Sequence, residues 1–333
     1  MKVTIVGAGA WGTALAMVLR RAGHETLIWA RTPAIAETIN RQHENPLYLP
    51  GLRLEPTIRA TAEIAALGGS DVVLLVTPAQ HLRTVAASLA SHVADTTPLI
   101  IGAKGIERQT GKLMTEVVAE ALPGRPLAVL SGPTFAAEVA RGLPTAVTLA
   151  CKDATLGAHL LNAIGTPAFR PYLSDDPLGA QIGGAVKNVL AIACGICVGR
   201  RLGDNARAAL MTRGLAEILR LGRALGAEPA TLMGLSGLGD LTLTCNSAQS
   251  RNMSLGIALG EGRPLAEIMA GRHSVAEGMF SAGAVVALAG RCGVETPISA
   301  AVDAIVTGSA AIDSTIAALL DRPFTQEATR LHA

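Results

Sequence analysis

A lysine in the middle of an apolar stretch is the first residue of this sequence that could do chemistry. Lys187 and Asn188 interrupt the long apolar run 178–199. At helical spacing Lys187 shares a stripe with small residues at positions 180, 183, 184 and 191. Two interpretations stay open. The amine reaches water from the helix edge, or it faces a cleft, where desolvation and neighbouring cations lower its pKa until it exchanges protons near neutral pH.

A second group of residues has the spacing of a phosphate-binding turn. Gly7, Gly9 and Gly12 form Gly-x-Gly-x-x-Gly. They follow the β-branched run Lys2–Val6 and lead into a helical pattern. The first glycine permits a tight turn, the second leaves room for a pyrophosphate, and the third lets the helix pack close to the strand. Free amides at the helix N-terminus then meet the phosphates. Residues 1 to about 31 are therefore predicted to bind a nicotinamide dinucleotide.

The end of the second predicted strand bears on which dinucleotide binds. An acidic residue there would accept a hydrogen bond from the 2′-hydroxyl of NAD. The sequence instead has Arg31, which cannot accept from a hydroxyl but can pair with a 2′-phosphate. NADP, as NADPH, is the favoured cofactor, with tolerance of NAD left open. The alternative is that Arg31 is a solvated surface charge.

Polar residues also follow two later strands of the predicted sheet. Lys104 stands in Ala-Lys-Gly directly after an apolar strand, and Ser131-Gly132-Pro133-Thr134 leaves another strand. The carboxyl ends of parallel strands meet at one edge, where such sheets bind ligands. Each segment could instead be an ordinary surface turn.

Further polar groups lie in the second half of the chain. Asp240 ends Gly-Leu-Gly-Asp, where it could present its carboxylate to a ligand or cap the next helix. Ser250, Arg251 and Asn252 are three neighbouring hydrogen-bond donors for an anion. The arginine fork matches phosphate geometry, although a polar helix start would give the same pattern.

The two halves of the sequence differ in their hydrophobic patterns, and these patterns predict the elements that position the candidate residues. In the first half, short apolar runs alternate with helical patterns, which is typical of a parallel sheet with crossover helices. The predicted helix at about Trp11–Ala22 lies among predicted strands at Lys2–Val6, Thr26–Trp29, Asp71–Val76, Leu99–Ala103, Leu127–Leu130, Thr145–Ala150 and Ala168–Tyr172.

Beyond Ser174-Asp175-Asp176-Pro177 the periodicity is helical almost throughout, with loops predicted at 199–205, 234–240 and 260–264. The expected fold class is α/β, an N-terminal Rossmann-like doubly wound sheet followed by an all-helical C-terminal domain. The expected division is a dinucleotide-binding domain at 1–176 and a helical substrate-binding and catalytic domain at 177–330.

Composition narrows the functional classes. The 333 residues are 50% hydrophobic, and the formal net charge is +2 with no basic block, which argues against nucleic acid as a partner. Lys187 and Asn188 leave the apolar run too short to span a membrane. Five scattered cysteines and the lack of a secretory signal favour a reducing, cytoplasmic setting. The Cys194/Cys197 pair is interpreted as small buried residues, and no metal site is expected.

As an ensemble these motifs resemble the bacterial type of NAD(P)-dependent glycerol-3-phosphate dehydrogenase. The resemblance runs from Met1 to about Ile298. It is carried by the segments 7–16, 45–49, 103–107, 130–136, 185–189, 237–241, 250–252 and 277–278. It implies a reversible, NAD(P)H-dependent reduction of dihydroxyacetone phosphate to sn-glycerol 3-phosphate, which supplies glycerophospholipid synthesis. The expected partner is thus a phosphorylated small molecule.

The resemblance also implies residue roles. Lys187 would exchange the proton, with Lys104 and Asp240 assisting. Implied substrate contacts are Lys104, Gly132, Thr134, Lys187, Asn188, Asp240, Ser250, Arg251 and Asn252. Expected cofactor contacts are Gly7, Gly9, Ala10, Trp11, Gly12, Arg31, Lys104, Ala136, Arg251, Val275 and Glu277, with Tyr48 on the nicotinamide side.

The sequence departs from the family pattern at two positions and leaves two rival functions. Ala10 stands where many members have Ser, and Ala276 where a second Val is common. One rival is a dehydrogenase for a 3-hydroxy acid, which Lys104 and the Ser-Arg-Asn run disfavour. The other is a cofactor sensor without catalysis, which has no need of Lys187 or Asp240. The oligomeric state stays open, and a homodimer is compatible with the sequence.

Overall fold

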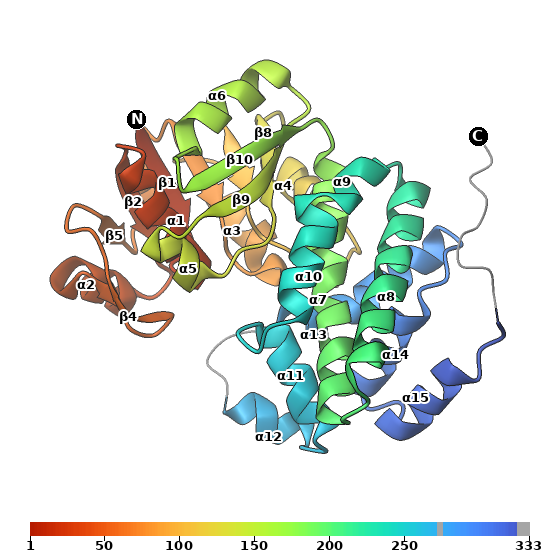
Figure 1. The fold of residues 1–333 in the computed structure, drawn as a ribbon. Helices are drawn as coiled ribbons and strands as arrows, with labels where there is room; N and C mark the ends of the chain where they lie inside the picture. The colour runs from red at the N-terminus through yellow and green to blue at the C-terminus, as the bar shows by residue number, and fades with distance from the viewer. Residues whose placement is uncertain (272–275, 325–333) are drawn as a thin grey trace.

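The computed structural model describes residues 1–271 and 276–324. Figure 1 shows a sheet flanked by helices in the N-terminal part and a bundle of helices in the C-terminal part. This arrangement confirms the predicted fold class.

The N-terminal part is built on an eight-stranded sheet in the order β10-β9-β8-β7-β6-β1-β2-β5. Its strands are β1 Lys2–Val6, β2 Glu25–Trp29, β5 Arg59–Thr61, β6 Val72–Leu75, β7 Leu99–Ile101, β8 Leu127–Ser131, β9 Thr145–Ala150 and β10 Phe169–Ser174. The chain proceeds outward in opposite directions from β1 and β6, which lie side by side. In such sheets the crevice at the carboxyl ends of these two strands is the ligand site.

The sheet is parallel except between β8 and β9, which run antiparallel. The connection between these strands holds α5 Ala136–Arg141, which packs against α1. A six-residue helix rises only about 9 Å, too little to return the chain across the sheet. The chain therefore re-enters the sheet from the edge at which it left, a reversal that the strand pattern did not predict.

Helices cover the sheet on both faces. They are α1 Ala10–Arg21, α2 Pro33–Gln42, α3 Leu82–Ser88, α4 Met114–Ala121 and α6 Ala154–Ile164, with 3-10 turns at Ile64–Leu67 and Ala79–His81. Alternate residues of β6 belong to different core clusters, Val72 and Leu74 to one and Val73 and Leu75 to the other. Burial on both faces explains why the central strands appear in the sequence as continuous apolar runs.

A small hairpin between α2 and β5 was not predicted. It consists of β3 Glu44–Asn45 and β4 Leu49–Arg53, and it packs against α5. Its strands are short, and β4 contains Pro50 and Gly51, which weaken any strand pattern in the sequence.

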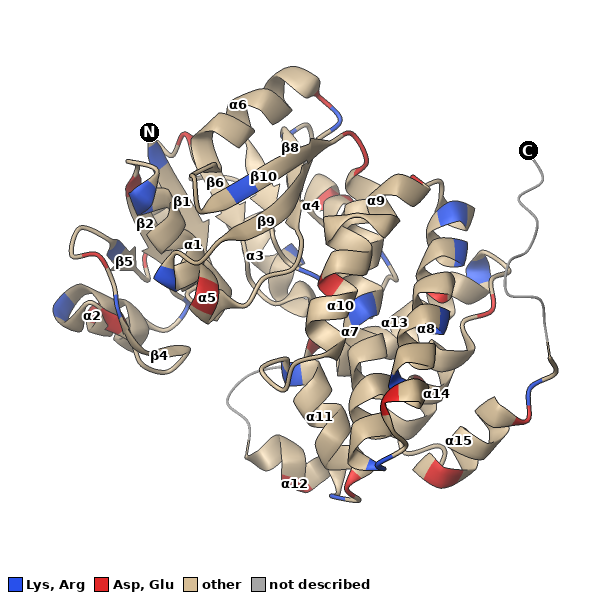
Figure 2. Ribbon diagram, viewed as in Figure 1, with Lys and Arg blue, Asp and Glu red and all other residues tan. Residues whose placement is uncertain are grey.

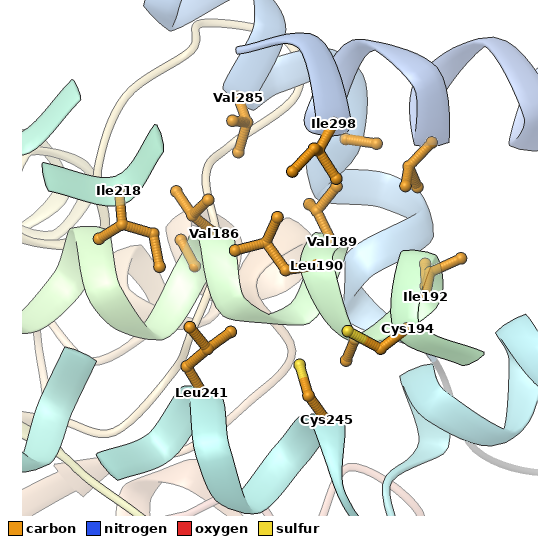
Figure 3. Packing of buried hydrophobic residues seen from close by; sticks show 14 of the residues in the cluster. Val186, Val189, Leu190, Ile192, Cys194, Ile218, Leu241, Cys245, Val285 and Ile298 are labelled. Carbon is orange, nitrogen blue, oxygen red and sulfur yellow. The ribbon is translucent and has the colours of Figure 1, made fainter. Parts of the chain in front are cut away.

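The elements described after β10 are all helical. They are α7 Pro177–Gly199, α8 Asp204–Leu225, α9 Pro229–Met233, a π-helical turn η3 Leu235–Gly239, α10 Asp240–Cys245, α11 Arg251–Gly260, α12 Leu265–Ala270, α13 Glu277–Arg291, α14 Pro297–Val306 and α15 Ile312–Leu320. Side chains of α7 such as Val186 and Leu190 pack between α10 on one side and α13 and α14 on the other (Figure 3).

By length and composition α7 could cross a membrane, but 83% of its most apolar window is buried inside the protein. That burial is what the central helix of a packed domain shows. Cys194 and Cys197 of α7 are both buried as predicted, and neither is in a disulfide.

The segment 234–240 is not the flexible loop that its glycines suggested. It forms the π-helical turn Leu235–Gly239, which runs directly into α10. A Cβ added to Gly237 would lie 1.9 Å from the Leu232 carbonyl oxygen, and one added to Gly183 would lie 2.5 Å from the Ser236 carbonyl oxygen. The glycines here permit close packing of the turn against itself and against α7.

Candidate active site

Two lysines and one aspartate meet where the helical part faces the sheet. Lys187 Nζ in α7 donates to Asp240 Oδ1 at 2.5 Å, and Lys104 Nζ after β7 donates to Asp240 Oδ2 at 2.6 Å. Asp240 is fully buried at the start of α10, and Lys187 is 7% exposed. One carboxylate thus joins two cations from the two halves of the chain.

The pKa of Lys187 is lowered to about 8. Burial is the largest cause, and the charge of Lys104 acts in the same direction, whereas Asp240 opposes both. The first interpretation of the sequence, an amine that reaches water, is therefore wrong. Lys187 instead lies buried with a pKa at which it can both give and take a proton near neutral pH.

The carboxylate of Asp240 does not cap its helix, which was the competing interpretation. The residue at the N-cap of α10 is Gly239, and no side chain caps the helix there. Both carboxylate oxygens are instead bonded to lysines. One helical turn on, Thr244 Oγ1 accepts a hydrogen bond from Lys187 Nζ at 2.9 Å. Thr244 was not predicted as a site residue, although its spacing of four residues from Asp240 in a helix was the available signal.

Lys104 is positioned by backbone and by a glycine. Its Nζ also donates to the Gly132 carbonyl oxygen at 3.0 Å, which links the ends of β7 and β8. A Cβ on Gly184 of α7 would lie 3.4 Å from Lys104 Cγ and Cδ and 3.0 Å from Ser131 Oγ. The absence of a side chain at Gly184 thus lets α7 pack closely against Ser131 and the Lys104 side chain.

Asn188 and Asn252 form a second buried network beside the lysines. Asn252 Nδ2 donates to Asn188 Oδ1 at 2.9 Å, and the Gly278 amide donates to Asn252 Oδ1 at 2.9 Å. Ser250 Oγ caps α11 by accepting from the Met253 amide at 3.2 Å. These bonds fix the start of α11, yet one Asn252 N–H and the Ser250 hydroxyl proton are not used by them.

Glu277 links the helical part to the sheet part. It opens α13, and it is bonded to the backbone of Ala79, which follows β6. Burial raises its pKa to about 7, against the opposing charge of Arg251 and the bond to Ala79. Its Oε2 is buried and lacks a hydrogen-bond partner in the described structure. An oxygen that is unsatisfied in this way has the capacity to accept from a bound ligand.

The glycine loop between β1 and α1 has the features of a phosphate cradle. Gly9 stands at the N-cap of α1, with no side chain bonded to the first amides of the helix. A Cβ on Gly12 would lie 1.9 Å from the Gly7 carbonyl oxygen, whereas a Cβ on Gly9 would meet nothing within 4 Å. Gly7 has φ +128°, which an L side chain rarely adopts.

Orphaned polar atoms next to this loop support the fit of a dinucleotide. Trp11 Nε1 and Thr77 Oγ1 are buried and have no hydrogen-bond partner in the described structure. Thr77 follows β6, and its amide would lie 3.1 Å from a Cβ on Gly7. Both atoms are thus close to the crevice at the β1–β6 switch point, and a bound ligand would give them partners.

The other residues predicted to contact the cofactor lie in different elements of the fold. Arg31 lies exposed two residues after β2, Tyr48 lies in the turn of the β3–β4 hairpin, and Ala136 opens α5. Val275 lies outside the described residues. Figure 2 shows residues of both charges distributed along the ribbon of both parts. No group of three or more His, Cys, Asp or Glu residues that could hold a metal occurs within the described part of the chain.

Comparisons with known proteins bear on this geometry. Residues 2–157 match the family model for the N-terminus of NAD-dependent glycerol-3-phosphate dehydrogenase, and residues 176–317 match the model for its C-terminus. This chain belongs to the NAD-dependent glycerol-3-phosphate dehydrogenase family. The resemblance inferred from the motifs is therefore confirmed.

Individual members of the dehydrogenase family are similar to this chain over almost its full length. Glycerol-3-phosphate dehydrogenase [NAD(P)+] of Parvibaculum lavamentivorans is 60% identical over 98% of this chain and 98% of its own. The protein of that name from Caulobacter vibrioides is 57% identical over 98% of this chain and 99% of its own. The crystal structure of glycerol-3-phosphate dehydrogenase from Coxiella burnetii has a TM-score of 0.93 at 39% identity, covering 96% of this chain and 99% of that one.

Proposed function

We propose that this protein catalyses the reversible reduction of dihydroxyacetone phosphate to sn-glycerol 3-phosphate with NADPH or NADH, and so supplies glycerophospholipid synthesis. The observation that carries the proposal is the buried Lys187–Asp240–Lys104 cluster, in which Asp240 joins Lys187 of the helical part to Lys104 of the sheet part. The family membership and the near-complete coverage of its relatives agree with it.

Lys187 is assigned as the proton donor and acceptor. The bound cofactor supplies or accepts a hydride at the substrate's carbonyl carbon. In the reducing direction the ammonium of Lys187 gives a proton to the carbonyl oxygen and takes another from solvent afterwards. In the oxidising direction the neutral amine takes the hydroxyl proton. A pKa of about 8 makes both forms available near neutral pH.

Lys104 and Asp240 tune and orient that amine. Lys104 stabilises negative charge on the substrate oxygen and, by its own charge, lowers the pKa of Lys187. Asp240 and Thr244 hold Lys187 Nζ by hydrogen bonds of 2.5 and 2.9 Å. The amine is thus oriented before substrate arrives, which is where much of the rate of such enzymes originates.

The phosphate of the substrate is assigned to the start of α11. Arg251 supplies a fork that can bind two phosphate oxygens. Ser250 and Asn252 have donors left after their bonds within the protein, and Asn188 joins Asn252 to the lysine helix. Gly132 and Thr134, after β8, complete the substrate site from the sheet side.

The cofactor is assigned to the crevice between β1 and β6. The residues that would hold it there are Gly7, Gly9, Ala10, Trp11, Gly12, Arg31, Lys104, Ala136, Arg251, Val275 and Glu277. Arg31 would pair with the 2′-phosphate of NADP, and the amides of the glycine loop would bind the pyrophosphate. Dinucleotide binding is assigned mainly to residues 1–176, with Arg251, Val275 and Glu277 added from the helical part, and substrate binding and proton transfer mainly to residues 177–330.

The setting of the protein is proposed to be the cytoplasm. All five cysteines are free thiols and four of them are buried, which suits a reducing compartment. A homodimer is the oligomer proposed, and light scattering on the purified protein tests it.

The decisive experiment follows nicotinamide absorbance with purified protein, dihydroxyacetone phosphate and each reduced cofactor in turn. Stoichiometric oxidation of the cofactor with formation of sn-glycerol 3-phosphate is expected. Unphosphorylated dihydroxyacetone is the matched control and should turn over far more slowly. Turnover of a 3-keto acid in place of dihydroxyacetone phosphate would establish the rival dehydrogenase. Cofactor binding without absorbance change for any carbonyl substrate would establish the sensor.

A further inference from the structure

A buried asparagine outside the glycine motif is bonded directly to the glycine loop. Asn45, in β3, is 2% exposed. Its Nδ2 donates to the Ala8 carbonyl oxygen at 2.8 Å and to Thr13 Oγ1 at 2.8 Å. Both amide hydrogens of Asn45 are therefore used, one on the loop and one on the first turn of α1.

The orientation of this amide is determined by its partners. The Ala8 carbonyl oxygen can only accept, so a flipped amide would place two acceptor oxygens against each other. The backbone of Asn45 is held as well. Its carbonyl accepts from the Tyr48 amide at 3.2 Å, and Pro46 restricts Asn45 to extended conformations.

The bond to Ala8 has a consequence for the amide of Gly9. A peptide unit is planar and trans, so its carbonyl and its N–H point in opposite directions. When Asn45 holds the Ala8 carbonyl on one side, the Gly9 N–H is directed to the other. A Cβ on Gly9 would meet no atom within 4 Å, so side chains leave space around this residue. A free N–H beside an open space at a helix N-terminus suits a phosphate oxygen.

We propose that Asn45 is a positioning residue for the cofactor. It holds the glycine loop in the conformation that presents its amides to the pyrophosphate. Because the same residue begins the turn that carries Tyr48, it also ties that turn to the loop. The inference rests on the proposed function, since it requires a dinucleotide at the glycine loop.

The test compares Asn45→Ala and Asn45→Asp with the unchanged enzyme. Each variant leaves the Ala8 carbonyl without its donor, so the KM for NADPH should rise about tenfold or more. At saturating NADPH the kcat should stay within about threefold, because the lysine cluster is untouched. The NADPH-induced rise in Tm should shrink in parallel.

Asn40 offers a matched control in the same part of the fold. Asn40 Nδ2 donates to the Ala60 carbonyl oxygen at 2.8 Å, and the Ala60 amide donates to Asn40 Oδ1 at 2.9 Å. This bridge joins α2 to β5 and does not involve the glycine loop. Asn40→Ala should lower Tm while the KM for NADPH stays unchanged. A purely structural role of Asn45 would give the same result as this control.

A second variant keeps the test decisive if neither Asn45 variant folds. Thr13→Val preserves the shape of the side chain but removes the other acceptor of Asn45, and it should raise the KM for NADPH about fivefold. The inference is overturned if folded Asn45→Ala, or Thr13→Val in its place, has an unchanged KM for NADPH. Failure of the unchanged enzyme to oxidise NADPH with dihydroxyacetone phosphate would instead refute the proposed function.

Discussion

The glycine loop and the lysine cluster are built in opposite ways. The loop places its candidate ligand groups within residues 7–12, and those groups are mostly backbone amides. The cluster combines side chains from the segment after β7, from α7 and from α10, and its two ion pairs span 136 and 53 residues of sequence. The glycine loop is thus formed by one short segment, whereas the lysine cluster forms only after the two halves of the chain have packed together.

This difference decides how each site responds to change. In the loop a Cβ on Gly9 would meet no protein atom within 4 Å, and residues 7–12 include no charged side chain. In the cluster one buried carboxylate balances two cations, so Asp240 and Lys104 both act on the pKa of Lys187, and Asp240 holds both amines in position. Substitutions in the loop should therefore act on cofactor binding, and substitutions in the cluster on proton transfer.

The largest effect is expected for Lys187→Ala. Loss of the proton donor should lower kcat by about 100-fold or more. The dissociation constant of NADPH, measured by fluorescence titration, should stay near that of the unchanged enzyme, because Lys187 is not part of the glycine loop. Lys152→Ala, which removes an exposed lysine, is the matched control and should leave both quantities unchanged. A near-normal kcat in Lys187→Ala would contradict the assignment of proton transfer to the lysine cluster.

The next largest effect is expected for Arg31→Asp. A carboxylate repels the 2′-phosphate of NADPH and can accept from the 2′-hydroxyl of NADH. The ratio of kcat/KM for NADPH to that for NADH should fall about 10- to 100-fold, the range of one lost charge-assisted hydrogen bond. Arg170→Asp changes an exposed arginine on β10 at the far end of the sheet and should leave the ratio unchanged. An unchanged ratio in Arg31→Asp would mean that Arg31 is a surface charge.

The pH dependence of turnover separates the two directions of the reaction. Reduction needs the ammonium form of Lys187, so its kcat should be level below pH about 8 and fall above it. Oxidation needs the neutral amine, so its kcat should rise through the same pH and level off above it. Profiles at saturating substrates in both directions measure this.

Asp240→Asn extends the pH experiment. The charge and hydrogen bond of Asp240 raise the pKa of Lys187, so their removal should move both inflections to lower pH. An inflection that stays in place or moves upward would contradict the assignment of Lys187. The NADPH dissociation constant of this variant should not change, which again separates the cluster from the loop.

The contrast also explains what could be predicted from the sequence. The loop, β1 and α1 were predictable because neighbouring residues carry the whole signal. Lys104, Lys187 and Asp240 could be named as candidates from their unusual places, but their ion pairs depend on how the two halves of the chain pack. Thr244 was missed because its one signal, a spacing of four residues from Asp240, is a spacing that many helical threonines have from a carboxylate without sharing its partner.

Asn45 and the turn at 235–239 likewise depend on contacts that neighbouring residues in the sequence do not reveal. Asn45 belonged to a segment that the motifs singled out, but its bond to Ala8 connects residues 37 positions apart. The glycines at 234, 237 and 239 looked like signs of a flexible loop. A glycine serves mobility, a positive φ or close packing, and only the neighbouring atoms decide which.

The smallest effects are expected for two glycine substitutions, which compare a glycine of the helix packing with a glycine of the loop. A Cβ on Gly256 of α11 would lie 2.1 Å from the Ile192 carbonyl oxygen of α7, so Gly256→Ala must push these helices apart. The free energy of unfolding should fall by about 1–3 kcal/mol, as for other overpacked sites. Because α11 begins with Arg251, which is assigned to the substrate phosphate, the KM for dihydroxyacetone phosphate should rise as well.

Gly9→Ala should behave in the opposite way. Its Cβ would meet no protein atom within 4 Å, and Gly9 has φ −71°, which alanine adopts without strain. Stability should therefore stay within about 0.5 kcal/mol of the unchanged enzyme. The methyl group lies in the space assigned to the pyrophosphate, so the KM for NADPH should rise. Thermal unfolding and steady-state kinetics on both variants measure the contrast. A loss of stability in Gly9→Ala with normal cofactor binding would show that this glycine, like Gly256, serves packing.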